Sequence, residues 1–196
     1  MTDKADLSRR HFLSAATAVT SGVGLAAAAV PFVASFRPSA RAQALGAPVE
    51  VDISKVEPGA LIKVEWRGRV IMIVHRTADM LGRLGSIDGI LADPASLESE
   101  QPGFADNEHR SLKPEILIVE GVCTHLACVP TPRFEVGPAD LGLDWPGGFY
   151  CPCHGSKFDL AGRVYSTMPA PTNLRVPPYS FVTESTVLIG AETGVS

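Results

Sequence analysis

All four cysteines of the chain and two of its five histidines lie in two short segments. Thiolates and imidazoles are the side chains that bind zinc and iron–sulfur clusters. The first segment reads C-T-H-L-A-C at 123–128, and the second reads C-P-C-H-G-S at 151–156. Each segment holds one Cys/His pair and one further cysteine. These residue types predict a metal centre shared between two loops, with one spare cysteine on each.

Three interpretations of these six residues compete. A structural zinc site would use two Cys and two His, but the C-x-H and C-x-x-H spacings differ from ordinary zinc fingers and leave two cysteines unexplained. Two disulfides would explain the cysteines and leave both histidines without a role. A [2Fe-2S] cluster on two Cys and two His, with the spare cysteines bridged, uses all six residues. We favour this third interpretation.

The elements that must position these loops are predicted to be short strands. Residues 115–120 form an apolar run directly before the first segment, and 149–150 precede the second. A turn at 67–69 joins two strands in a hairpin, and the spacing of apolar residues predicts one short helix over 77–84. The other runs bounded by Gly, Pro or polar residues are 48–53, 61–66, 70–75, 157–160, 163–165, 179–183 and 186–189. This pattern predicts a mainly β fold, a small antiparallel sandwich.

The composition indicates one apolar segment attached to an ordinary domain. The chain has 196 residues and a formal net charge of −4, which argues against nucleic-acid binding. Its mean hydropathy of +0.16 is high for a soluble domain. The excess lies in 12–36, which carries no charge. Twenty-five helical residues reach about 37 Å, enough to cross a hydrocarbon core of about 30 Å. We therefore predict one transmembrane helix.

The residues before this segment, S-R-R-H-F-L at 8–13, resemble a twin-arginine export signal. They predict an N-terminus in the cytoplasm and a domain on the far side of the membrane. We expect a cytoplasmic signal region at 1–11, a transmembrane anchor at 12–36, a flexible hinge at 37–48 and a head domain at 49–196. Small residues around Ala40-Arg41-Ala42 also offer a cleavage site.

The pair of boxes C-T-H-L-x-C and C-P-C-H-G-S resembles those of Rieske iron–sulfur proteins. Beyond the boxes, the chain resembles the iron–sulfur subunits of bacterial ubiquinol–cytochrome c reductase. The matching stretches are 66–68, 75–77, 91–94, 169–171 and 174–177. The resemblance implies a Rieske-type antiparallel β-sandwich head with a small cluster-binding subdomain within about 120–172. It also implies that the N-terminal segment is retained as an anchor.

The resemblance implies a role for each residue of the boxes. In such proteins the two cysteines and two histidines hold one [2Fe-2S] cluster, the spare cysteines form a disulfide, and the histidines accept a hydrogen bond and proton from quinol. A serine donates to a bridging sulfide, and apolar residues, together with the loop at 169–171, shield the cluster. The corresponding residues here are Cys123 and Cys151 on one iron, His125 and His154 on the other, Cys128 and Cys153 in the disulfide, Ser156, and Leu126.

The implied function is that of a subunit in a dimeric respiratory complex. The head would take an electron and a proton from ubiquinol bound to cytochrome b and pass the electron to cytochrome c1 on the periplasmic side. The anchor would contact lipid of the bacterial inner membrane. Two alternatives remain open: the small Rieske subunit of another exported oxidase, such as arsenite oxidase, and a zinc module without redox chemistry.

The sequence departs from the family pattern in three places. Phe158 stands where mitochondrial relatives have a tyrosine that hydrogen-bonds to a cysteine ligand, so we expect a lower reduction potential. Ala127 replaces the usual glycine of the first box, which predicts a backbone not restricted to positive φ. The stretch 129–150 is longer than the mitochondrial loop.

Overall fold

The computed structural model describes residues 2–190, and it divides into two units, Met1–Ala44 and Leu45–Ser196. The end of the predicted head domain, 191–196, lies outside the described residues. In the first unit, helix α1 (Thr2–Ser35) begins well before the apolar run. Its segment Asp6–Ser35 is long and apolar enough to cross a membrane. A second, short helix, α2 (Ala40–Gly46), lies within the predicted hinge.

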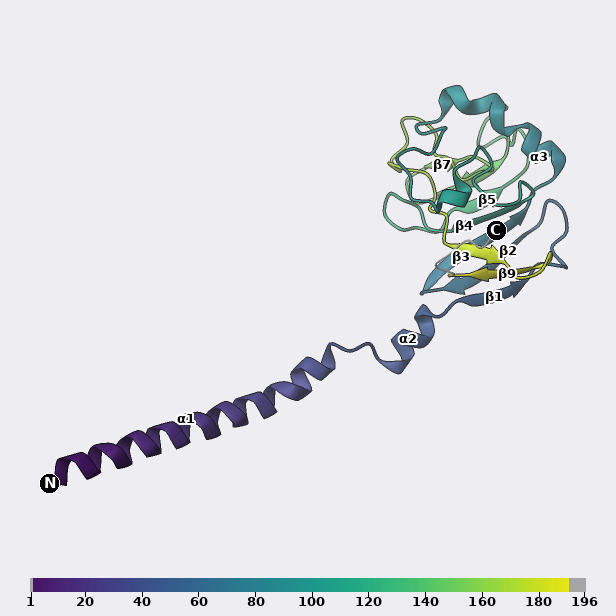
Figure 1. Ribbon diagram of the computed structural model, residues 1–196. Helices are drawn as coiled ribbons and strands as arrows, with labels where there is room; N and C mark the ends of the chain where they lie inside the picture. The colour runs from purple at the N-terminus through teal and green to yellow at the C-terminus, as the bar shows by residue number, and fades with distance from the viewer. Residues whose placement is uncertain (1, 191–196) are drawn as a thin grey trace. The chain divides into compact units, whose positions relative to one another are not determined.

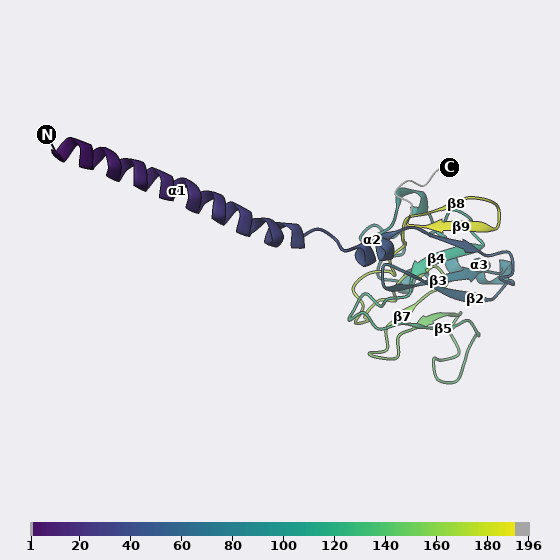
Figure 2. The same cartoon turned by 90° about the horizontal axis from the view of Figure 1, so that it is seen from below.

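The described part of the second unit contains three antiparallel sheets of three strands each (Figures 1 and 2). The first sheet, in the order β1-β9-β8, contains β1 (Val49–Asp52), β9 (Thr186–Ile189) and β8 (Tyr179–Phe181). The second, in the order β2-β3-β4, contains β2 (Leu61–Trp66), β3 (Arg69–His75) and β4 (Ile116–Glu120). The third, in the order β5-β6-β7, contains β5 (Thr131–Arg133), β6 (Gly148–Tyr150) and β7 (Lys157–Phe158). The mainly antiparallel β fold predicted from the sequence is confirmed.

The β2–β3 hairpin follows from its turn residues. Trp66 pairs with Arg69, so the connection has two residues. Both adopt positive φ, 51° at Arg67 and 70° at Gly68, as a tight turn between twisted antiparallel strands requires. The register of the hairpin places β3 in the centre of its sheet, between β2 and β4.

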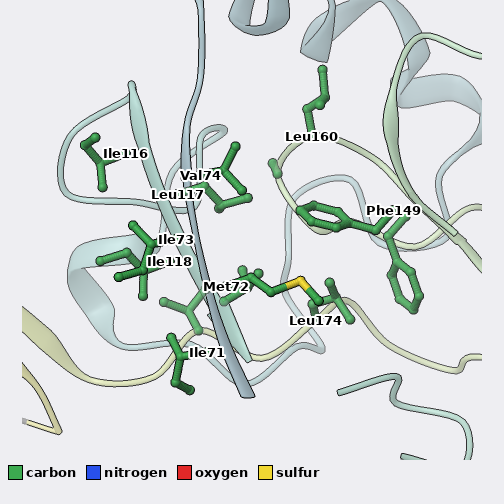
Figure 3. Close-up of a cluster of buried hydrophobic side chains, with 14 of the residues drawn as sticks. Ile71, Met72, Ile73, Val74, Ile116, Leu117, Ile118, Phe149, Leu160 and Leu174 are labelled. Atoms are coloured by element: carbon green, nitrogen blue, oxygen red, sulfur yellow. The ribbon is translucent and has the colours of Figure 1, made fainter. Parts of the chain in front are cut away.

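The core forms on both faces of β3 and β4. Four consecutive apolar residues of β3 are buried, and so are all five residues of β4, of which the first four are apolar. Continuous apolar runs of this kind predict strands covered on both sides. Figure 3 shows Met72 and Val74 directed toward Phe149, Leu160 and Leu174. The sheet β2-β3-β4 therefore packs against the part of the chain that carries the second cysteine box.

The structure differs from the predicted elements in two short segments. Residues 163–165 form isolated bridges, Phe158 with Val164 and Leu91 with Tyr165, and not a strand. The Asp159 carboxylate explains this, since it accepts from two amides of the tight turn after β7 and so interrupts the ladder. Strand β5 has the sequence T-P-R, which carries no alternating signal. The predicted helix is confirmed as α3 (Ala78–Gly82), which two short 3-10 helices, η1 (Leu84–Ile90) and η2 (Gly103–Ala105), follow in the chain.

Candidate metal centre

Two strand ends present the Cys/His segments. The first ligand loop, 123–128, begins three residues after Glu120 at the end of β4. The second ligand loop, 151–156, runs from the end of β6 to the start of β7. Strand β5, which follows the first loop, pairs antiparallel with β6, which precedes the second loop. This pairing brings the two loops to the same end of the sheet.

Both loops form the same backbone turn. In the first, the Cys123 amide donates to the carbonyl of Cys128 (2.7 Å), and the Ala127 amide donates to the carbonyl of Cys123 (3.0 Å). In the second, the Cys151 amide donates to the carbonyl of Ser156 (2.8 Å), and the Gly155 amide donates to the carbonyl of Cys151 (2.9 Å). These two bonds close each loop on its leading cysteine, so Cys123 and Cys151 each stand at the start of a closed turn.

The backbone at Ala127 corrects one prediction. Ala127 has φ 62° and Gly155, the equivalent residue of the second loop, has φ 79°. The expectation that alanine relaxes the requirement for positive φ is therefore wrong. The left-handed conformation of Ala127 turns the chain so that the carbonyl of Cys128 meets the Cys123 amide, and the loop holds the alanine there despite its Cβ.

A disulfide between Cys128 and Cys153 joins the two loops across a sequence separation of 25 residues. The pairing expected from the family resemblance is confirmed. Cys128, Cys151 and Cys153 also place their sulfur atoms within 4.8 Å of one another. That trio is not a metal-ligand set as it stands, because two of its sulfurs are already bonded to each other.

The two remaining cysteines are free and buried together. Cys123 is 2% exposed and Cys151 is 1% exposed, and the neighbouring Cys151 thiol contributes to raising the pKa of Cys123. Burial raises the pKa of the Cys123 thiol, although hydrogen bonds from the backbone of His125 and the hydroxyl of Ser156 act in the opposite direction. Two adjacent buried thiols suit a positive metal ion that stabilises both as thiolates.

The two histidines, one from the middle of each loop, lie next to each other. Their rings are 4.7 Å apart between centroids and meet edge to face at 84°. His154 is exposed and His125 is half-buried. The Nδ1 atom of His125 is buried and has no hydrogen-bond partner among the described residues. A buried imidazole nitrogen without a partner fits a ligand atom, so this donor set fits a cluster held by two thiolates and two imidazoles.

A third loop covers the centre. The Ala170 amide donates to Ser156 Oγ (3.1 Å), and Thr124 Oγ1 donates to the carbonyl of Thr172 (2.7 Å). This third loop, 169–172, contains the stretch 169–171 that was predicted as a shield, and it is tied to both ligand loops. Ser156 is fully buried against it, whereas Leu126, also predicted as a shield, is 65% exposed.

Buried charged side chains bind the segments that follow the second and third loops, and no sequence pattern indicates them. Arg110 is fully buried and donates to the carbonyls of Ala161 and Leu174, and burial lowers its pKa to about 10. Arg163 is 2% exposed and pairs with the buried Asp159. Since isolated arginines occur in most sequences, only the three-dimensional structure identifies which of them lie inside.

Phe158, the departure noted in the sequence, is fully buried and pairs with Phe149 across β6 and β7. Its ring carries no hydroxyl, so this position supplies no hydrogen bond to a ligand sulfur. The longer stretch 129–150 is folded on Trp145, which is 3% exposed and donates through Nε1 to the carbonyl of Arg133.

Comparisons with known proteins agree with this site. Residues 103–179 match the Rieske [2Fe-2S] domain, and residues 1–39 match the family described as Ubiquitinol-cytochrome C reductase Fe-S subunit TAT signal. The second match confirms the twin-arginine signal. Together with the apolar helix, it fits a membrane-anchored protein.

The chain is 56% identical over 186 residues to the ubiquinol-cytochrome c reductase iron-sulfur subunit of Allochromatium vinosum, covering 95% of this chain and 90% of the relative. It is 44% identical over 192 residues to the same subunit of Blastochloris viridis, covering 96% of each. A solved structure titled Hyperthermophilic respiratory Complex III matches with a TM-score of 0.48 and 23% identity, covering 89% of this chain and 98% of the other. The chain belongs to the family of Rieske iron–sulfur subunits of ubiquinol–cytochrome c reductase.

Proposed function

We propose that this subunit accepts an electron and a proton from ubiquinol bound at cytochrome b and passes the electron to cytochrome c1. One observation carries this proposal. Two loops, joined by a disulfide, carry two buried free thiols and two imidazole rings whose centroids are 4.7 Å apart. Family membership supplies the complex in which this arrangement acts.

We assign Cys123 and Cys151 to one iron of the [2Fe-2S] cluster and His125 and His154 to the other. When bound, a cluster with two neutral imidazole ligands takes up one electron at a potential of roughly −150 to +300 mV, against about −400 mV for plant-type ferredoxins. The buried pair of thiols and the more exposed pair of rings support this division, because the histidine end is then the end that meets quinol.

The histidines would handle the proton. The partnerless Nδ1 of His125 faces the interior, which leaves Nε2 for a hydrogen bond from the quinol hydroxyl. His154 is exposed, so its ring is also within reach of a partner surface. An imidazole nitrogen accepts the proton as the quinol loses an electron, and releases it to water once the head has left the quinol site.

The surrounding residues would exclude water and locate the quinol ring. Leu126 directly follows the ligand His125 and is exposed, so its side chain offers an apolar contact beside that ring. The hydroxyl oxygen of Ser156 accepts a hydrogen bond from the Ala170 amide, so the hydroxyl proton is left to donate toward a sulfur. This bond and the one from Thr124 to Thr172 keep the third loop closed over the site.

We also propose the organisation in which the head works. Residues 1–11 would remain in the cytoplasm, 12–36 would anchor the subunit in the inner membrane, and 37–48 would let the head, 49–196, move between cytochrome b and cytochrome c1 in the periplasm. The division of the chain near residue 44 and the short α2 helix support a separate head on a tether. Two such subunits would serve a dimeric complex.

Purification of the membrane complex that contains this subunit tests the proposal. We expect b-type and c-type haem subunits, quinol-dependent reduction of the c-type haem, and a Rieske electron paramagnetic resonance signal after reduction. Co-purification with a molybdenum subunit would instead assign the chain to another exported oxidase, and zinc in place of iron would contradict the redox role. Consecutive prolines in 37–48 should slow turnover and leave the cluster signal unchanged; unimpaired turnover would contradict the moving head.

A further inference from the structure

The disulfide of the metal centre has a free thiol beside it. The sulfur atoms of Cys128, Cys151 and Cys153 all lie within 4.8 Å of one another. Two of these sulfurs form the bridge, and the third, Cys151, is a free, buried thiol. Thiol–disulfide exchange begins with a thiolate next to a disulfide sulfur, so the site contains all the reactants of such an exchange.

We propose that the centre carries a second activity, an intramolecular thiol–disulfide exchange that occurs whenever Cys151 is not bound to iron. The proposal rests on the assignment of Cys151 as a cluster ligand. The Cys151 thiolate attacks Cys128 Sγ, a Cys128–Cys151 bond forms, and the Cys128–Cys153 bond breaks. Cys153 leaves as a thiolate and takes up from water the proton that Cys151 gave to water. One disulfide and two thiols are present before and after, so no oxidant is needed.

The exposure of the sulfurs favours attack on Cys128. Cys153 is exposed, so the thiolate that leaves is solvated by water. Attack on Cys153 would instead expel the half-buried Cys128 and would close a bridge between cysteines separated by a single residue, a small and strained ring. The exchange thus moves the free thiol from the interior to the surface.

The other free thiol, Cys123, provides a natural comparison. It is buried like Cys151, but it does not belong to the group of three neighbouring sulfurs found among the described residues. Cys151 lies with the bridge and Cys123 does not. The geometry therefore assigns the attack to one of two otherwise similar thiols.

The exchange determines the order of assembly. A chain that has exchanged keeps its loops joined, but Cys151 is consumed, so only one of the two buried thiols remains for iron. A bridged chain that loses its cluster must therefore reverse the exchange before it can bind a cluster again, whereas a chain that receives its cluster before the bridge forms avoids this step. A signal that exports folded proteins is consistent with this order, because the bridge forms outside the reducing cytoplasm.

Disulfide mapping of the full chain in detergent tests the proposal. The cluster-loaded protein is first labelled under native conditions with a thiol reagent, where Cys151 should be protected; labelling there would contradict its assignment as a ligand. A second sample loses its cluster to an iron chelator without oxygen and is then held at pH 8. Portions are quenched with a maleimide and mapped by mass spectrometry. We expect the label to move from Cys151 to Cys153 and Cys128 to become bonded to Cys151, with two labelled thiols throughout.

Two single variants are the matched controls. Cys123→Ser, which lacks the cluster as isolated, should already be exchanged, with its one labelled thiol at Cys153 and Cys128 bonded to Cys151. Cys151→Ser should keep the Cys128–Cys153 bridge. A wild-type bridge that persists after loss of the cluster would overturn the proposal, and so would exchange through Cys123 in the Cys151→Ser variant, since the geometry would then not select the attacking thiol. A fall in the number of thiols to zero would show oxidation of Cys123 with Cys151 and would also contradict it.

Discussion

The first and second ligand loops have the same backbone turn and different side chains. In both, the leading cysteine amide donates to the carbonyl five residues later, and a left-handed residue at the fifth position donates back to the cysteine carbonyl. The histidine is the third residue of the first loop and the fourth of the second. His125 is half-buried, whereas His154 is exposed.

The comparison shows which features the turn requires and which it permits. The turn needs a left-handed residue at one position, and alanine and glycine both occupy it here. It leaves free the positions of the histidine and of the bridging cysteine, Cys128 at the end of the first loop and Cys153 in the middle of the second. The two loops are therefore similar supports that present their ligands from different points.

Loss of a cysteine ligand from either loop should have the largest effect, because it removes the bound cluster. Cys123→Ser and Cys151→Ser each remove one of the two buried thiols, and a neutral hydroxyl does not replace a thiolate ligand. We expect at least about a tenfold loss of bound iron in each and no Rieske signal after reduction. Thr124→Ser, which keeps the hydroxyl that donates to Thr172, should retain the cluster. Full iron content in either cysteine variant would mean that the cysteine of that loop is not required to bind the cluster.

Removal of the connection between the loops should have the next largest effect. Replacement of Cys128 and Cys153 together by alanine opens a loop with a sequence separation of 25 residues. Loop-closure entropy gives a loss of about 3 kcal/mol in the free energy of unfolding. Denaturant unfolding of the full chain in detergent measures it. A loss below about 1 kcal/mol would show that the third loop and the buried arginines already hold the two loops together.

The substitutions Gly155→Ala and Ala127→Gly should change the free energy of unfolding in opposite directions. Gly155→Ala places a Cβ at φ 79°, where the nearest atom, Tyr150 Oη, is 3.9 Å away, so the change adds strain without a clash. We expect a loss of about 1 kcal/mol. Ala127→Gly removes the same strain from the first loop and should change stability by less than about 1 kcal/mol, in the stabilising direction. Equal effects of the same sign in the two melting curves would contradict the equivalence of the two turns.

The smallest effect should come from a hydrogen bond that the second loop lacks. Phe158→Tyr adds the donor that the family resemblance implies for this position, and Phe158 is fully buried on β7, two residues after Ser156. A hydrogen bond worth about 1 kcal/mol corresponds to a rise of about 40 mV in a one-electron potential. Redox titration followed by electron paramagnetic resonance measures the shift. Phe149→Tyr, in the paired strand, is the control, and an unchanged potential in Phe158→Tyr would rule out a donor role for this position.

Much of the fold was predictable because its signals are local. The apolar runs at β3 and β4, the two-residue turn of Arg67 and Gly68 and the uncharged run within α1 each depend on neighbouring residues alone. The residue types and spacing of the Cys/His segments are equally local, and they suffice to predict the metal centre. The absent strand at 163–165 could not be predicted in this way, because the side chain of Asp159 interrupts its ladder.

The residue types and their spacing are enough to predict the chemistry of the centre, since thiols and imidazoles at these spacings restrict the cofactor that two loops can hold. Which groups are buried and which of them meet follows only from the packing of the folded chain. Packing encloses Arg110 among carbonyl groups and places the free thiol of Cys151 beside the disulfide. These outcomes depend on contacts between residues far apart in the chain, because burial and proximity are properties of packing and not of local sequence.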